Sequence, residues 1–206
     1  MKWHVLVLGI LCVSMALVFP LQGGISGSAH DFSTANWNFS GEICITCHTP
    51  HNAVPDVEAG RLWNHQLTDA TFVLYSSDTF DGSQTIGQPS ATSKLCLSCH
   101  DGTVALDNFG GFTGGTEFTF LTIGPDLSTS HPISFTYDSA LAVVDRELYD
   151  PKVHQSGLGG TIDSDLLYKG RLECTSCHDV HNTSGADFLL VKSNAGSALC
   201  LTCHNK

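Results

Sequence analysis

Positively charged residues are scarce in this 206-residue chain, which has 9 Lys and Arg residues against 20 Asp and Glu residues. The formal net charge of −11 argues against a nucleic-acid-binding protein, because such proteins use basic patches to displace counterions from phosphates. Charged residues make up only 14% of the chain and hydrophobic residues 42%, in a length that suits one domain or two small ones.

Methionine is nearly absent, and both copies, Met1 and Met15, lie at the extreme N-terminus. This segment has the layout of a secretory signal peptide, in which Lys2 supplies a positive charge and an apolar run of fifteen residues follows. The run is shorter than the roughly 20 apolar residues that cross a bilayer as a helix. We therefore interpret residues 1–24 as a signal peptide with an approximate cleavage site, and 25–206 as one exported domain without methionine. An uncleaved N-terminal anchor is the alternative.

Cysteine has the most informative placement. Of the nine cysteines, Cys12 lies in the predicted signal peptide and the other eight form four copies of the motif Cys-x-x-Cys-His. The copies are CITCH at 44–48, CLSCH at 96–100, CTSCH at 174–178 and CLTCH at 200–204. This is the attachment motif of c-type haem, in which two thiols form thioethers with the vinyl groups and the following histidine reaches the iron. We predict four covalent haem c groups, attached through Cys44, Cys47, Cys96, Cys99, Cys174, Cys177, Cys200 and Cys203.

Other kinds of site also use paired cysteines. Zinc takes cysteine and histidine ligands in tetrahedral sets, but a zinc site does not account for a histidine directly after the second cysteine in all four copies. A thioredoxin-like redox pair needs a single motif in a βαβ setting, and structural disulfides need no histidine. Haem is therefore favoured over zinc and disulfides.

The remaining side chains indicate that each iron is held by two histidines. The predicted proximal ligands are the motif histidines His48, His100, His178 and His204. Cytochrome iron commonly takes Met or His as its second ligand, and the exported chain has no methionine. Outside the signal peptide and the motifs, the histidines are His30, His51, His65, His131, His154 and His181. An iron with two histidines has no open position for a substrate, so we predict an electron carrier and not an enzyme.

Two histidines follow a proximal histidine by three residues, His51 after His48 and His181 after His178. Residues three apart share a helical face, so each can reach the iron of an adjacent haem packed alongside. We predict that His51 serves the second haem and His181 the fourth; a hydrogen bond to a propionate is the alternative. The other distal candidates are His30, His65 and His131, and His154 is the weakest of the six histidines. The five candidates exceed the four distal positions, so one of them is surplus or acts across subunits.

The expected fold is a multihaem cytochrome c that is mostly coil, with short helices and few strands wrapped around four stacked haems. The 20 glycines and the sparse helical periodicity favour irregular backbone. We expect short helices at each motif and over 139–148, and a strand over 117–123, where EFTFLTI partly alternates. Trp63 is expected to border a haem.

Several segments together carry a family resemblance: CITCHTPHNA, LWNH, CLSCHDGTVA, HPISF with the following Tyr137, and ECTSCHDVHN. They resemble multihaem c-type cytochromes of metal-respiring bacteria, and in number and order of motifs the OmcE-type extracellular tetrahaem cytochromes that polymerise into filaments. The similarity runs from about His30 to the C-terminus. It implies a chain of bis-histidine haems that continues between subunits, with one axial histidine donated across the interface. We predict that the segment carrying His30 makes this donation.

Three functions suit these features. The first is a subunit of an extracellular conductive filament that passes respiratory electrons to external acceptors such as metal oxides. The second is a soluble periplasmic tetrahaem shuttle, and the third is a multihaem oxyanion reductase, which needs an iron with an open position. The expected partners are identical subunits in a head-to-tail polymer, other electron-transfer cytochromes and the external acceptor. The expected location is extracellular or at the cell surface, with the periplasm as the alternative.

Overall fold

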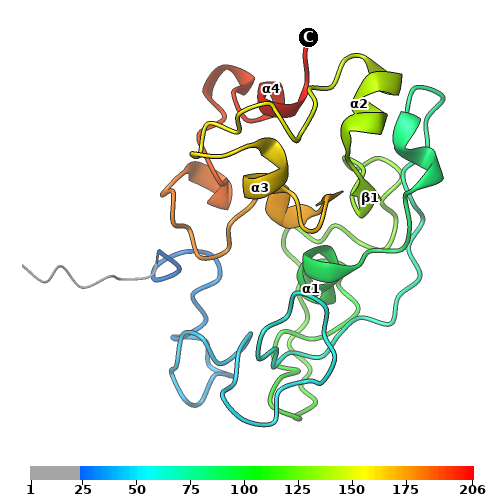
Figure 1. The fold of residues 1–206 in the computed structure, drawn as a ribbon. Helices are drawn as coiled ribbons and strands as arrows, with labels where there is room; N and C mark the ends of the chain where they lie inside the picture. The colour runs from blue at the N-terminus through cyan, green and yellow to red at the C-terminus, as the bar shows by residue number, and fades with distance from the viewer. Residues whose placement is uncertain (1–23) are drawn as a thin grey trace, which may run out of the picture.

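The computed structural model describes residues 24–206, most of which lie in turns and loops (Figure 1). The predicted signal peptide falls almost entirely on residues outside this range. The helices are α1 (Ala91–His100), α2 (Ser139–Asp145), α3 (Ile162–Leu166) and α4 (Cys200–Cys203), and the short 3-10 helices are η1 (Asp81–Gln84), η2 (Cys174–Ser176), η3 (Asp187–Leu189) and η4 (Ala195–Ser197). Strands β1 (Phe135–Thr136) and β2 (Arg171–Leu172) pair antiparallel, with Phe135 opposite Leu172. These elements confirm the prediction of mostly coil with short helices and few strands.

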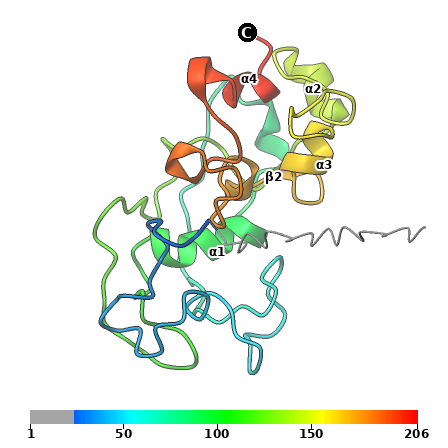
Figure 2. The same ribbon diagram turned by 90° about the vertical axis from the view of Figure 1, so that its left-hand side faces the viewer.

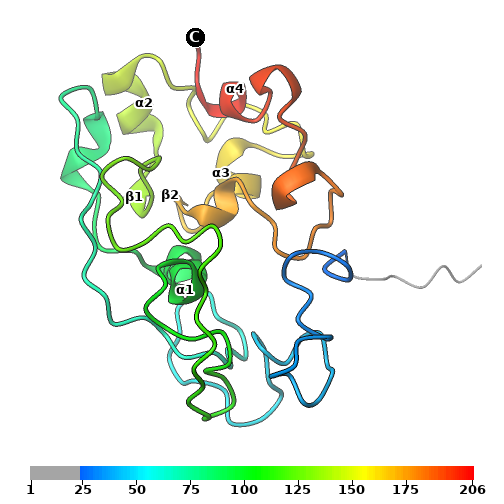
Figure 3. The same cartoon turned by 180° about the vertical axis from the view of Figure 1, so that it is seen from behind.

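Helix α1 lies between two differently built parts of the molecule (Figures 1, 2 and 3). The N-terminal loops and the loops that follow α1 lie on one side of it, and α2, α3 and α4 lie on the other. The C-terminus leaves α4 at the end of the molecule that is remote from the N-terminal loops. Within 24–206, no helix has the length and apolar character needed to cross a membrane.

The predicted helix over 139–148 is confirmed for its first seven residues as α2. It begins after Asp138, whose carboxylate accepts a hydrogen bond from the backbone N–H of Leu141 at 2.9 Å. It ends at Arg146, which has a left-handed backbone with φ of 65°. The helix is therefore shorter than predicted because its C-terminal residue leaves the helical conformation.

The predicted strand over 117–123 is wrong, since the segment forms no strand. Leu121 has a φ of 59°, which an extended strand does not allow. The backbone N–H of Ile123 instead donates to the carbonyl of His100 at 2.7 Å. The segment is thus held against the end of α1 and not against a second strand.

The apolar core is small and divided between the two parts. The larger cluster joins the sheet to α3 and consists of Phe135, Tyr137, Ile162, Leu166 and Leu172. The smaller cluster packs against α1 and consists of Phe72, Leu97 and Leu127. A core of this size in a chain of this length is compatible with a small multihaem cytochrome, in which cofactors supply part of the apolar interior.

Truncation of the larger cluster should destabilise the fold. Ile162 is fully buried, and Ile162→Ala is expected to lower the free energy of unfolding by about 2–5 kcal/mol because it leaves a cavity. The exposed Val143 of α2 is the matched control, and Val143→Ala should change that free energy by less than about 0.5 kcal/mol. Guanidinium titrations followed by circular dichroism measure both. Equal effects of the two substitutions would contradict this assignment of the core.

Candidate haem sites

Each Cys-x-x-Cys-His motif closes one turn of helical backbone. In the first, third and fourth motifs the N–H of the histidine donates to the carbonyl of the first cysteine, at 2.8 Å for His48 and 3.0 Å for His178 and His204. The second motif forms the last turn of α1. Such a turn brings the first cysteine, the second cysteine and the histidine towards one face. The predicted short helices are thus found at three motifs, while the first motif is a turn without a helix.

The thiols of consecutive motifs are neighbours in space. All eight cysteines in the described part of the chain are free. Burial raises the pKa of Cys99 and Cys203 to about 12 and that of Cys47 to about 11. Thiols of different motifs also affect one another's pKa. These pairs are Cys47 with Cys96 and Cys99, Cys96 with Cys174, and Cys177 with Cys200 and Cys203. The attachment sites therefore follow one another in space in the order first, second, third, fourth.

Three motif histidines have a second histidine ring opposite them. The ring centroids lie 5.9 Å apart for His30 and His100, 6.3 Å apart for His48 and His181, and 6.4 Å apart for His131 and His204. The ring planes of the last two pairs meet at 16° and 74°. Rotation of an imidazole about its metal bond leaves the centroid distance unchanged, so both angles suit one shared ion.

The spacing fits the group that the motifs imply. Typical metal–imidazole bonds are about 2.0–2.1 Å long, and a ring centre lies about 1.2 Å beyond the nitrogen, so two imidazoles on one ion have centroids about 6.4 Å apart. The pairs of His48 and of His204 match this distance, and the pair of His100 is about half an ångström shorter. These residues therefore fit a haem iron with two histidine ligands.

Backbone carbonyls fix the orientation of several of these rings. Nδ1 of His48 lies 2.8 Å from the carbonyl oxygen of Arg61, and Nδ1 of His131 lies 2.9 Å from that of Pro132. Nδ1 of His178 lies 3.1 Å from the carbonyl oxygen of Phe188. A carbonyl only accepts, so Nδ1 carries the hydrogen and the lone pair is on Nε2. Metal-binding histidines are oriented in the same way by second hydrogen bonds.

His30 lies near the second motif. Its ring lies beside His100 of the same chain, whereas the donation of His30 to another subunit stays a prediction. Turns hold the segment to its own chain, because Asp31 accepts the backbone N–H of Gly27 at 2.7 Å and Phe32 packs on Trp37 at 5.3 Å. The Nδ1 of His30 is buried without a hydrogen-bond partner. Burial lowers the pKa of His30, with smaller contributions from His100 and His178.

The ring of His181 lies beside that of His48 of the first motif, and its assignment to the fourth haem stays a prediction. The histidine ring beside His204 of the fourth motif is that of His131, one of the predicted distal candidates. Sequence spacing could not identify the histidine that lies beside His204. The three-residue spacing of His178 and His181 predicts only that the two share a helical face, and not which haem His181 reaches. His51 is exposed, and no described ring contact joins it to the second motif.

Two other histidines are engaged elsewhere. His65 is buried, with Nδ1 2.8 Å from the carbonyl oxygen of Gln66 and Nε2 3.0 Å from that of Ala105. Its ring lies against the second motif, with Nε2 3.6 Å from Sγ of Cys99. His154 stacks on Tyr149 at 3.7 Å. Among the ring contacts of 24–206, none places a histidine opposite His178.

Two aromatic side chains border the motif histidines. Trp63 lies edge-on to His48 at 6.3 Å, at the place expected from the LWNH segment. Phe118 lies edge-on to His100 at 5.0 Å and was missed by the sequence analysis. The apolar run over 117–123 was the only signal for it, and that run suggested a strand.

Comparisons with known proteins support the cofactor assignment. A family model described as a doubled CXXCH motif matches residues 168–206, which contain the third and fourth motifs. No curated protein matches the chain. The paired motifs indicate covalently bound haem c, haem-based electron transfer and a multihaem c-type cytochrome.

Removal of a distal histidine should change the spin state of one haem. His131→Ala takes away the imidazole opposite His204, which leaves one side of that iron without a protein ligand. We expect a high-spin component in the electronic and electron paramagnetic resonance spectra that the parent protein lacks. His154→Ala is the control and should leave the spectra unchanged, because that ring stacks on Tyr149. Unchanged low-spin spectra for His131→Ala would exclude this pairing.

Proposed function

We propose that this chain is an exported electron carrier with four covalently bound haem c groups, each held by two histidines. The observation that carries the proposal is the pairing of histidine rings at three of the four motifs, with two of the pairs at the spacing of one shared metal ion. When bound, the haems supply one-electron iron chemistry. The chain's own residues attach the haems, fix the axial imidazoles and set the order of the sites.

The order of the sites suits transfer along a row. Thiols of each motif neighbour thiols of the next, from the first motif to the fourth. Two imidazoles at three of the four irons favour electron transfer over reduction of a bound substrate at these sites. A non-enzymatic carrier is therefore favoured over an oxyanion reductase.

We further propose that identical subunits join head to tail into an extracellular filament. The C-terminal motif and the N-terminal loops lie at opposite ends of the molecule, which suits heterologous contacts that do not close (Figure 3). His178 has no histidine opposite it within 24–206, whereas His51 is exposed. We assign His51 to the third haem of an adjacent subunit. A soluble periplasmic shuttle is the second candidate, in which another ligand completes that iron.

The haem count tests the core of this proposal. Mass spectrometry and pyridine haemochrome assays of the secreted protein should give four haems per chain and an N-terminus near Gly24. Replacement of both cysteines of one motif, for example Cys174→Ala with Cys177→Ala, should remove one haem and leave three. Fewer than four haems on the parent chain would refute the stoichiometry.

Filament assembly should respond to salt in a defined direction. Without residues 1–24 the chain loses Lys2 and has 8 Lys and Arg against 20 Asp and Glu, a formal net charge of −12. Subunits with this charge repel one another, and salt screens that repulsion with a Debye length of about 8 Å at 0.15 M. Negative-stain microscopy and light scattering should therefore show more and longer filaments as salt is added. Dissolution of filaments by salt would show that ionic contacts hold the subunits together. The absence of filaments at every salt concentration would favour the periplasmic shuttle.

A further inference from the structure

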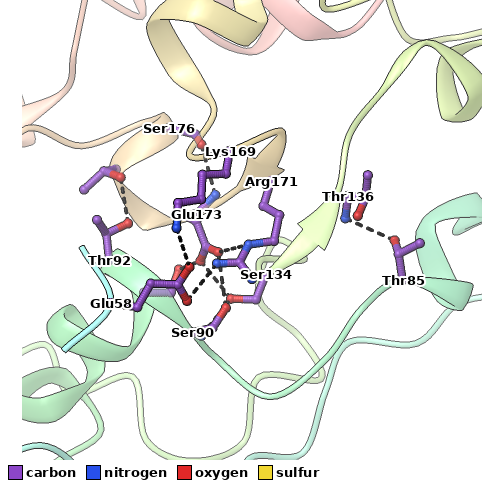
Figure 4. A network of polar contacts seen from close by, with 12 residues as sticks. Glu58, Thr85, Ser90, Thr92, Ser134, Thr136, Lys169, Arg171, Glu173 and Ser176 are labelled. Carbon is purple, nitrogen blue, oxygen red and sulfur yellow. Dashed lines mark hydrogen bonds and ion pairs between the residues drawn. The ribbon is translucent and has the colours of Figure 1, made fainter. Parts of the chain in front are cut away.

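A buried carboxylate lies directly before the third motif and belongs to no haem-ligand pair. Glu173 is 1% exposed, and its side chain is completely covered. It connects β2 to η2, so it stands between the sheet and the first cysteine of the motif (Figure 4). Buried glutamates are rare unless paired, so this position calls for a physical explanation.

The carboxylate is surrounded by hydrogen-bond donors. Ser93 Oγ and Ser134 Oγ both donate to Oε2, the latter at 2.8 Å, and Ser90 Oγ lies 3.5 Å from Oε1. Arg171 forms an ion pair with it, with Nε 3.3 Å from Oε1. The hydroxyl groups thus donate hydrogen bonds to the carboxylate, and the guanidinium of Arg171 places a positive charge beside it.

The ion pair continues to the surface through two further charges. Arg171 Nη2 donates to Glu58 at 3.2 Å, and Lys169 Nζ donates to the other oxygen of Glu58 at 3.4 Å (Figure 4). Lys169 is exposed and Glu58 partly so, whereas Glu173 has no contact with solvent. Solvent therefore screens the outer charges more strongly than the inner carboxylate.

The same network joins the second attachment site to the third. Ser93 of α1 donates to Glu173 and also accepts the backbone N–H of Cys174 at 2.9 Å. Beside it, the hydroxyls of Thr92 and Thr175 are 2.7 Å apart. One buried carboxylate thus ties the helix of one motif to the first residues of the next.

We propose that Glu173 positions the second and third haem-attachment sites relative to each other and holds the reduction potentials of these two haems low. Reduction of a ferric iron adds an electron, and a fixed negative charge in a poorly screened interior disfavours this step. The inference rests on the proposed attachment of haem to both motifs. It adds to that function a residue that is not a haem ligand and whose buried charge acts on the second and third haems.

Two substitutions of opposite charge and their combination provide the test. The haem-loaded protein is titrated with a reductant under potentiometric control while its visible spectrum is recorded. Glu173→Gln keeps the shape of the side chain and removes its charge, so two of the four one-electron steps should shift to higher potential. Arg171→Gln should shift the same steps to lower potential. The double variant should return them towards the parent values, because its net change in charge is zero.

An exposed carboxylate provides the matched control. Asp78→Asn makes the same change in charge at an exposed position and should move no step by a comparable amount. Unchanged potentials in Glu173→Gln, or shifts of the same sign in both single variants, would overturn the proposal. Should Glu173→Gln fail to fold, Arg171→Gln and Glu173→Asp provide the test. The inference is supported if two reduction potentials are lowered in Arg171→Gln and all potentials stay near the parent values in Glu173→Asp. Any other pattern refutes it. The haem count of the parent protein is measured separately. Failure of the proposed function is therefore distinguished from failure of this inference.

Discussion

The proposed function makes the arrangement of this chain depend on pairs of imidazole rings whose separation suits two ligands of one metal ion. His48 and His181 are far apart in sequence, and so are His131 and His204, yet their rings stand at the separation that a shared iron requires. Each pair closes a long loop. Apolar packing contributes little to this closure, because the described apolar core has only two small clusters. Metal binding that orders a chain contributes directly to its folding free energy. We therefore regard the paired rings as the principal constraint on the fold, with β1, β2 and α3 as a local core beside them.

The parts of the fold that could be predicted are those in which chemistry is local. Cys-x-x-Cys-His is a five-residue pattern whose backbone must turn to present thiols and imidazole together, and each copy does so. Helix α2 was also predictable, because its cap at Asp138 and its small apolar residues are contiguous. The strand over 117–123 was mistaken because alternation of apolar residues can equally reflect residues that border a cofactor site. Phe118, edge-on to His100, is such a residue.

The distal ligands could be predicted as a set but not as pairs. Counting histidines and the absence of methionine limited the candidates, while the choice among them depends on loops whose course has no local signature. His30 illustrates this: its proximity to the N-terminus suggested contact with another subunit, whereas the contacts of Asp31 and Phe32 that hold the segment to its own chain have no such signal. Glu173 had no sequence signal at all, because its partners Ser93 and Ser134 come from α1 and from the loop before β1. Its role emerges only when the second and third motifs are seen together.

The central claim is that three identified histidine pairs each share one iron. A cryo-electron microscopy map of the haem-loaded, secreted protein tests it most directly, because it shows every axial nitrogen. We predict continuous density from His30 through iron to His100, from His181 to His48, and from His131 to His204. Density that joins any of these proximal histidines through its iron to a different residue, or an iron with an open axial position at these three sites, would contradict the account.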